Sequence, residues 1–230
     1  METMGRGVAV AEEPKSPSWP SVQPVLFGDR VTLRPWHPND AAIVYRICQD
    51  PDIQYWTRIP VPYERGHAAE FTGLHAPRSW SDGAGAAFAV TDSHSAEVLG
   101  SVGLVAIDAE DMVGEVGYWI APAARRRGVA TASIAMLASW ALGEVGLARL
   151  ELLIEPENIG SRKAAERAGA VLEGVMRSKA KNRAGQRCDL SLYAILPDTC
   201  LIDGFKQKVC GDGAGSSGHA GPFTILGRTG

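Results

Sequence analysis

The order of strand and helix patterns between residues 115 and 168 restricts the fold more than any other feature of this chain. Glu115–Ile120 and Arg149–Ile154 have the composition of buried strands, while Thr131–Val145 and Ser161–Ala168 carry apolar residues at helical spacing. A loop that contains a glycine joins the first strand to the first helix. This order predicts a βαβα unit, in which the two strands are parallel neighbours and the first helix crosses between them.

The remaining apolar pattern predicts a mixed α/β domain around this unit, with a polar turn that joins two strands as a hairpin. The expected strands are Arg30–Arg34, Ala86–Thr91, Val98–Ile107 and Leu190–Leu196, the last of which is expected to close the sheet. The expected helices are Ala41–Gln49, after the N-cap signal Pro38-Asn39-Asp40, and Glu64–Leu74. We therefore expect a single folded domain over residues 26–198.

Both ends differ in composition from the middle of the chain. Residues 1–25 contain four prolines among small and charged residues, and residues 199–230 include a run rich in glycine and serine. Segments of this kind bury too little apolar surface to offset the entropy that is lost when they become ordered. We therefore predict flexible tails over residues 1–25 and 199–230.

Charge and cysteine usage exclude several classes of protein. A formal net charge of −3 argues against general nucleic-acid binding. No apolar run reaches the ~18–20 residues that cross a bilayer, and the N-terminus lacks the apolar core of a secretory signal. The four cysteines form no CxxC pair, which argues against structural zinc but leaves a Cys200–Cys210 disulfide open. We expect a cytoplasmic protein with reduced thiols and no metal.

The loop Arg125–Thr131 carries the strongest chemical signal. It lies between a strand and a helix, and the N-terminus of a helix offers unpaired N–H groups and a partial positive charge. Gly128 and Ala130 keep side chains away from that end, so a phosphate can reach the backbone, and the arginines add full charges. The loop therefore resembles a pyrophosphate-binding site, with a solvated basic turn as the alternative.

The surroundings of this loop favour a polyphosphate ligand. Residues 125–187 contain 12 Lys and Arg against 6 Asp and Glu, in a chain whose net charge is negative. The loop lacks the Gly-Lys-Ser/Thr ending of nucleoside-triphosphatase loops and the three-glycine fingerprint of dinucleotide folds. Those two families of nucleotide-binding protein are therefore set aside.

Arg125-x-x-Gly128-x-Ala130 after an apolar strand resembles the acetyl-coenzyme-A signature of the GNAT N-acetyltransferases, Gln/Arg-x-x-Gly-x-Gly/Ala. The preceding strand with Pro122, and the later Asn158-x-x-Ser161 segment, fit the same family. Ala165–Ala170, which follows that segment, fits the family as well. Further segments resemble its Rim-type branch, which acetylates protein N-terminal amines; these are Thr32–Pro35, Leu172–Val175 and Asp189–Leu196. The resemblance covers residues 26–198.

The resemblance implies a GNAT fold, in which a central mixed β-sheet flanked by helices splays open between strands 115–120 and 149–154. The pantetheine arm of acetyl-CoA would lie in that gap, and its pyrophosphate would meet the amides of residues 127–131. The residues that the resemblance implies as cofactor-binding are Trp119, Ile120, Arg125, Arg126, Arg127, Gly128, Val129, Ala130, Thr131, Asn158, Ser161 and Arg167. Arg162 and Lys163 are weaker candidates for the phosphates.

Three residues are candidates for catalysis. Glu115 is the leading general base, because the family often places an acidic residue there; a solvent-facing strand residue is the alternative. Ser161 is the candidate donor to the departing thiolate, with a plain helix N-cap as the alternative. Tyr118 is a further candidate acid, although Tyr-Trp on a strand is typical of a core.

The predicted function is acetyl-CoA-dependent N-acetylation of a primary amine, by direct transfer in a ternary complex. A protein or peptide α-amine is the first acceptor class, and a small-molecule amine is the second. The alternative is a non-catalytic acyl-CoA-binding module of the same fold. The sequence leaves open whether the protein forms a homodimer. Tyr55, Trp56 and Tyr63 either line the amine pocket or pack in the core, and His67 and His75 lack partners for a metal site.

Overall fold

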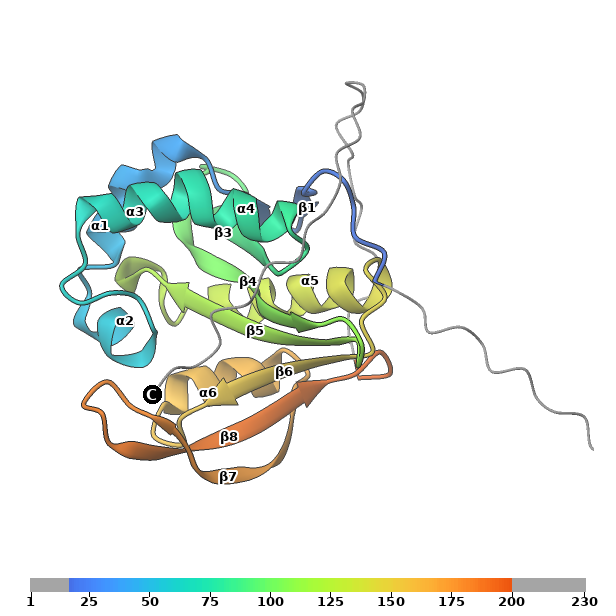
Figure 1. Ribbon diagram of the computed structural model, residues 1–230. Coiled ribbons are helices and arrows are strands. Elements are labelled where there is room, and N and C mark those ends of the chain that lie inside the picture. Colours follow the sequence, from blue (N-terminus) through green and yellow to red (C-terminus); the bar gives the residue numbers. More distant parts are fainter. Residues whose placement is uncertain (1–16, 200–230) are drawn as a thin grey trace, which may run out of the picture.

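The computed structural model describes residues 17–199 as one eight-stranded mixed sheet flanked by helices (Figure 1). The strands follow one another across the sheet in the order β1-β2-β3-β4-β5-β6-β8-β7. Their bounds are β1 Leu26–Phe27, β2 Val31–Pro35, β3 Ala86–Asp92, β4 Val98–Asp108, β5 Val113–Ile120, β6 Arg149–Ile154, β7 Val171–Lys181 and β8 Arg187–Ile195. All neighbouring pairs are antiparallel except β5 and β6.

The helices form two groups, one before β3 and one after β5. The first group comprises η1 Pro38–Asp40, α1 Ala41–Ile47, α2 Pro51–Trp56, α3 Arg65–Glu70, the π-helical turn η2 Phe71–His75 and α4 Ala76–Ser81. The second comprises η3 Pro122–Ala124, α5 Val129–Gly143 and α6 Ile159–Arg167. Helix α5 is apolar on nearly all sides because it packs against β2, β4, β5, β6 and α6.

The predicted βαβα unit is confirmed, since β5 and β6 are parallel neighbours and α5 connects them. The strand predicted to close the sheet does not close it. Instead β8 lies between β6 and β7, because β7 pairs with β8 as a long hairpin and forms the sheet edge. The predicted helix Glu64–Leu74 is part of a longer run that continues through η2 and α4 to Ser81.

The sheet splays where β5 parts from β6. Only three residue pairs join these strands, and Glu115 opposite Glu151 is the last of them. A β-bulge in β4 between Leu104 and Ala106 lies against the same residues of β5. Since a bulge bends and twists its strand locally, it helps to turn the rest of β5 away from β6. Residues 116–120 of β5 consequently face a gap in the sheet.

Part of the segment assigned to the N-terminal tail packs against the domain. Trp19 stacks on Trp80 with ring centroids 4.5 Å apart, and its Nε1 donates a hydrogen bond of 2.9 Å to the carbonyl of Trp80. Trp19 also meets the ring of Trp140 edge-on. Residues 17–25 therefore belong to the ordered part of the chain, whereas residues 1–16 and 200–230, Cys200 and Cys210 among them, lie outside the described residues.

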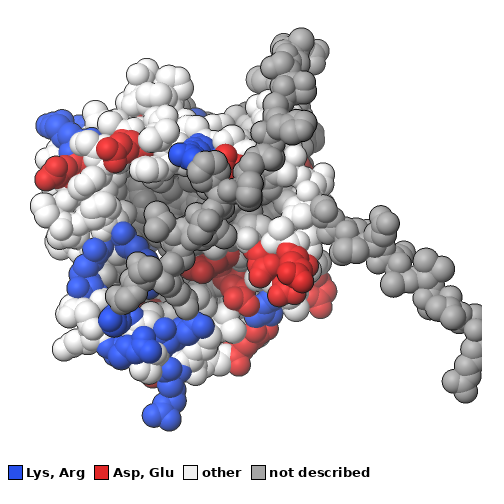
Figure 2. Space-filling view, viewed as in Figure 1, with Lys and Arg blue, Asp and Glu red and all other residues white. Residues whose placement is uncertain are grey.

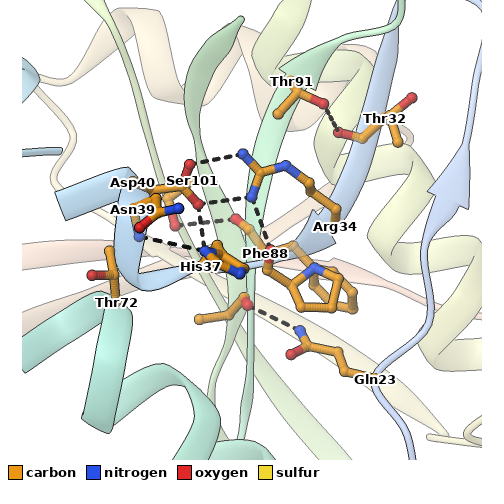
Figure 3. Close-up of polar contacts among 12 residues, drawn as sticks. Gln23, Thr32, Arg34, His37, Asn39, Asp40, Thr72, Phe88, Thr91 and Ser101 are labelled. Atoms are coloured by element: carbon orange, nitrogen blue, oxygen red, sulfur yellow. Dashed lines mark hydrogen bonds and ion pairs between the residues drawn. The ribbon is translucent and has the colours of Figure 1, made fainter. Parts of the chain in front are cut away.

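A partly buried ion pair fixes the corner after β2 (Figure 3). Both terminal nitrogens of Arg34 donate to the carboxylate of Asp40, at 2.7 and 2.9 Å, and the amide of His37 donates to the same carboxylate. Burial pushes the pKa of Asp40 upward, but these hydrogen bonds outweigh it and hold the pKa below its ordinary value. The corner positions Trp36, whose ring stacks on Trp119 of β5.

Within residues 17–199, no helix is long and apolar enough to cross a membrane. The same residues contain no cluster of three or more His, Cys, Asp or Glu side chains with the geometry of a metal site.

Candidate active site

The N-terminus of α5 follows the strand β5 that parts from β6, and Arg30 donates a hydrogen bond of 3.2 Å to the carbonyl of Arg127 beside it. Gly128 is the N-cap and adopts a φ of +76°, a left-handed conformation that glycine reaches without strain. No side chain caps this helix, so the N–H groups of its first turn are not satisfied by a capping residue. Together with the helix dipole, these groups form a site suited to an anion.

The three consecutive arginines before Gly128 have different surroundings. Arg126 and Arg127 are exposed beside the helix start, while the side chain of Arg125 is held elsewhere. Arg125 forms ion pairs with Asp50 and Asp52, the latter at 2.9 Å, and its Nε donates to the carbonyl of Ile120. Its guanidinium therefore joins the predicted phosphate loop to the start of α2, and only its backbone lies with the loop.

Tyr118 and Ser161 meet across the mouth of the gap. The Oη of Tyr118 lies 2.7 Å from the Oγ of Ser161, on the first turn of α6. Asn158 is the N-cap of α6, because its side chain accepts a hydrogen bond of 3.1 Å from the amide of Ser161. The capping role therefore belongs to Asn158, and the hydroxyl of Ser161 is available for the contact with Tyr118.

The environment of Tyr118 keeps its hydroxyl protonated. Burial raises the pKa of Tyr118, and the hydrogen bond with Ser161 offsets only part of this effect. A phenol with a raised pKa remains neutral well above pH 7 and can donate a proton along the Tyr118–Ser161 pair. The pair is thus a short relay of two hydroxyls that leads to the gap between β5 and β6.

Glu115 lies on the other face of β5 from Tyr118. Successive side chains of a strand point to opposite faces, so Glu115 shares its face with Trp119. Glu115 is half-buried and stands opposite Glu151 at the last pair that joins the two strands. Four residues of a strand span about 13 Å, which is the separation of Glu115 from Trp119 along β5.

Trp119 borders a cavity on this second face. The cavity has a volume of about 160 Å³ and is formed by α1, the segment 59–63, α3, η2 and β5. Its lining residues are Val44, Cys48, Ile59, Pro60, Tyr63, His67, Glu70, Phe71, His75 and Trp119. Of the three aromatic residues weighed for an amine pocket, Tyr63 lines this cavity, whereas Tyr55 and Trp56 pack on each other outside it.

Helix α2 is tied down at both ends. Arg125 holds its N-terminus, and Arg183 at the tip of the β7–β8 hairpin holds its C-terminus. Arg183 donates hydrogen bonds to the carbonyls of Gln54 at 3.0 Å, Thr57 at 2.7 Å and Ile59 at 2.6 Å. The hairpin therefore reaches across the gap and fixes the segment that forms one wall of the cavity (Figure 1).

The other predicted cofactor residues lie along the same region. Thr131 on the first turn of α5 is 3.5 Å from the carbonyl of Ala164, so α5 and α6 meet near their N-terminal halves. Val129 is buried, Ala130 is half-buried and Arg167 ends α6 as an exposed residue. Arg162 donates to Tyr193 at 3.1 Å and to a backbone carbonyl, so its side chain is part of the packing of α6.

Charge is unevenly distributed over this side of the molecule. Figure 2 shows Lys and Arg gathered over the end of the β7–β8 hairpin, and Asp and Glu gathered near the β4–β5 turn. The cations of the hairpin are Arg177, Lys179, Lys181, Arg183 and Arg187. At the β4–β5 turn, Asp108 accepts hydrogen bonds from the amides of Glu110 and Asp111. The carboxylate of Asp108 therefore stabilises the backbone of this acidic turn.

Sequence reasoning missed two contributors to the site. Helix α2 had a recognisable start, because Asp50 is an N-cap and Pro51 takes the first helical position. No local signal marks Arg183, since its partners lie more than 120 positions away in the chain.

Residues 30–171 match the model of a protein family described as an acetyltransferase (GNAT) domain, and this match spans more than half of the chain. The chain belongs to the GNAT acetyltransferase family. The match includes the splay of β5 from β6 and the uncapped start of α5.

Relatives of this acetyltransferase support the same fold over most of its length. N-acetyltransferase p20 of Bacillus licheniformis is 25% identical over 171 residues, which cover 74% of this chain and 95% of p20. A GCN5-related N-acetyltransferase from Brucella melitensis is similar with a TM-score of 0.67 and 26% identity, over 80% of this chain and 84% of that one. RimJ of Mycobacterium smegmatis, in complex with CoA-disulfide, has a TM-score of 0.69 and 24% identity, over 82% of this chain and 93% of that one.

Proposed function

We propose that this acetyltransferase transfers the acetyl group of acetyl-CoA to a primary amine, in a ternary complex. The observation that carries the proposal is the Tyr118–Ser161 hydroxyl pair at the gap between β5 and β6, beside the uncapped start of α5. The pyrophosphate would bind the first amides of α5, with Arg126 and Arg127 adding charge. The pantetheine arm would run along residues 118–120 to bring the thioester beside Ser161.

Side chains on the two faces of β5 take part in different steps of the transfer. The amine nitrogen attacks the thioester carbonyl from the face of Trp119, the C–N bond forms, and the C–S bond then breaks. The departing thiolate takes a proton from Ser161, which Tyr118 replaces. The proton lost by the amine passes to Glu115 along a chain of water molecules, because about 13 Å of strand separates Glu115 from Trp119. When the thiol leaves, Tyr118 regains a proton from solvent and Glu115 releases one to it.

A protein or peptide α-amine is the first acceptor class. An α-amine with a pKa near 7.7–8.0 is roughly one tenth neutral at pH 7, so it needs less help from a base than a lysine does. A small-molecule amine is the second class. A homodimer and a cytoplasmic location stay predictions.

Turnover and binding of acetyl-CoA test the proposal together. Purified protein is incubated with acetyl-CoA and a panel of peptides and small amines, and release of the thiol and the mass of the product are recorded. We expect acetylation of at least one amine, and a loss of turnover with retained acetyl-CoA binding in Ser161→Ala and in Glu115→Gln. Binding of acetyl-CoA without thiol release from any amine would favour a non-catalytic module, and unchanged turnover in a variant would remove that residue from its role.

A further inference from the structure

The cavity beside Trp119 opens at the segment of β5 where the proposed transfer takes place. Tyr118 and Trp119 are adjacent in the chain, so their side chains leave opposite faces of β5. Tyr118 contacts Ser161 on one face, and Trp119 lines the cavity on the other. A group held in the cavity therefore sits next to the gap in the sheet, within reach of a thioester placed there. This inference accordingly rests on the proposed function.

The inner wall of the cavity suits an uncharged apolar group. Val44, Ile59, Phe71 and Trp119 supply apolar and aromatic surface. The polar groups of the wall are neutral, because burial raises the pKa of the Cys48 thiol to about 12 against a smaller lowering by its hydrogen bond with Tyr63. Burial also raises the pKa of the Tyr63 hydroxyl. A hydrocarbon group bound against this inner wall would therefore not strip water from a charged side chain, which would cost free energy.

The volume of the cavity limits the size of its occupant. A volume of about 160 Å³ is close to that of an apolar protein cavity of ~150 Å³ that binds benzene. One phenyl ring, or an aliphatic group of similar size, would fill it. A methyl group would leave most of the wall without contacts, and a two-ring group would not fit without movement of the wall.

The mouth of the cavity is shaped by the π-helical turn. His67, Phe71 and His75 follow one another at intervals of four residues. In an α-helix each such interval overshoots a turn by about 40°, whereas the wider π turn from Phe71 to His75 offsets the overshoot. The three side chains consequently all reach the cavity. π-Helical turns occur frequently at functional sites.

The charges at the mouth favour a cation. Glu70 is the carboxylate among the lining residues, and these residues include no lysine or arginine. The carboxylate of Glu70 lies 3.9 Å from Nε2 of His75, which also lines the mouth and carries a charge only when protonated. Arg65, the nearest arginine in the helix, instead lies over the ring of Tyr45 at 4.5 Å. The Nδ1 of His67 accepts a hydrogen bond of 3.1 Å from the amide of Glu64, so this nitrogen is engaged at the start of α3.

We propose that this cavity is the acceptor's side-group site, and that it selects primary amines that carry one phenyl-sized apolar group near the nitrogen. Both an aralkyl amine and a peptide with phenylalanine or leucine as its first residue have this chemistry. Small or acidic first residues would gain nothing from the apolar wall, and an acidic one would be repelled by Glu70. Ile59 and Phe71 are then specificity-determining residues of the acetyltransferase.

Matched acceptors give the first test. The value of kcat/KM is measured for peptides that differ only in the first residue (Phe, Leu, Ala or Asp) and, separately, for 2-phenylethylamine and ethylamine. We expect Phe or Leu to exceed Ala by at least about tenfold, because a single methylene group in a hydrophobic pocket already discriminates by about 10- to 200-fold. The peptide and amine series distinguish the two sources of the same group. Acetylation at equal rates for Phe, Ala and Asp would overturn the inference and leave the proposed function intact.

A cavity-filling variant gives the second test. Ile59→Trp places a large ring into the cavity from a half-buried position on a loop, and Leu74→Trp places the same ring on an exposed position of η2 outside the cavity. We expect Ile59→Trp to bring the Phe-to-Ala ratio of kcat/KM close to one. Leu74→Trp keeps the ratio of the unchanged protein. A ratio unaffected by Ile59→Trp would overturn the inference.

Calorimetry decides the inference independently of turnover. 2-Phenylethylamine is titrated into the full chain in the presence of CoA, which carries no acetyl group to transfer. Binding to the unchanged protein that is lost in Ile59→Trp and kept in Leu74→Trp supports the cavity as the site, even if no amine is acetylated and the proposed function fails. Absence of binding to the unchanged protein, or binding that Ile59→Trp leaves intact, refutes it.

Discussion

The hydroxyls of Tyr118 and Ser161 lie 2.7 Å apart, although 43 positions of sequence separate the two residues and they come from a strand and a helix. The contact exists because Asn158 caps α6 and turns the first helical residues toward β5. It joins two residues that the sequence offered as separate candidates into a single unit. The energetic consequence is that their contributions to turnover should not be additive.

Tyr118→Phe and Ser161→Ala are both expected to lower kcat, and Ser161→Ala is expected to lower it more. Loss of the proton donor nearest to the thiolate costs about 10²–10⁴-fold, and loss of the tyrosine behind it costs less. The double variant should be no slower than Ser161→Ala, because the tyrosine acts through the serine. The KM for acetyl-CoA should change little in all three. Tyr45→Phe on α1 is the matched control and should retain full turnover.

The pH profile follows from the direction of the Tyr118 shift. Burial raises the pKa of Tyr118, so the hydroxyl stays protonated through the range pH 6–9. The ratio of kcat between the unchanged protein and Tyr118→Phe should therefore be constant over this range. A ratio that falls towards one as pH approaches 9 would contradict the assigned proton donor.

Gly128→Ala is expected to destabilise the protein and weaken acetyl-CoA binding. An L-residue at a φ of +76° pays about 1–2 kcal/mol relative to glycine. The matched change Gly143→Ala lies at the other end of α5 with open space around it, and it should raise the free energy of unfolding by about 0.5–1 kcal/mol. Urea unfolding of both variants measures these opposite signs. Equal effects would mean that the backbone conformation of Gly128 is not the cause.

Asp40→Asn should remove part of the pH dependence of stability. Because the folded pKa of Asp40 lies below its unfolded value near 3.9, the ion pair with Arg34 stabilises the fold above that pH and is lost as pH falls through the folded pKa. We expect a loss of roughly 1–3 kcal/mol at pH 7 and a smaller difference at pH 3. Asp82→Asn, which breaks an exposed pair with Arg78, should cost less than about 0.5 kcal/mol at either pH.

Arg183→Ala should weaken binding of the amine more than binding of acetyl-CoA. Three hydrogen bonds from Arg183 hold the end of α2 and the carbonyl of Ile59. Their loss should raise the KM for the amine about fivefold, which corresponds to about 1 kcal/mol, with the KM for acetyl-CoA unchanged. Arg183→Lys should not restore it, because one ammonium cannot replace the fork of a guanidinium. Arg187→Ala on the same hairpin is the control.

Local pattern accounts for most elements of the fold. The strands Arg149–Ile154 and Val113–Ile120, and the helices α5 and α6, lie within a few residues of their predicted bounds, because apolar periodicity and capping signals are properties of short stretches. Helix α2 also had a local signal at Asp50 and Pro51. No local signal predicts the position of β8 inside the sheet, because the pairing of an antiparallel strand depends on how the strands pack in the folded protein.

The candidate site divides in the same way. The glycine at the start of α5, the arginines before it and the pair Asn158 and Ser161 can be read from short motifs, because each motif acts through the backbone next to it. Contacts between residues that lie far apart in the chain cannot be read from such motifs. The ion pairs of Arg125 with α2 exist only because folding brings residue 125 against residues 50 and 52.

Spacing and glycine placement act over a few residues, so short stretches of sequence suffice to predict the parallel βαβα unit and the start of α5 at Gly128. Tertiary structure alone decided which side chains meet there. Tyr118 reaches Ser161, Arg183 reaches the end of α2, and Trp119 closes a phenyl-sized cavity, because these contacts depend on strand register and on packing between segments far apart in the chain.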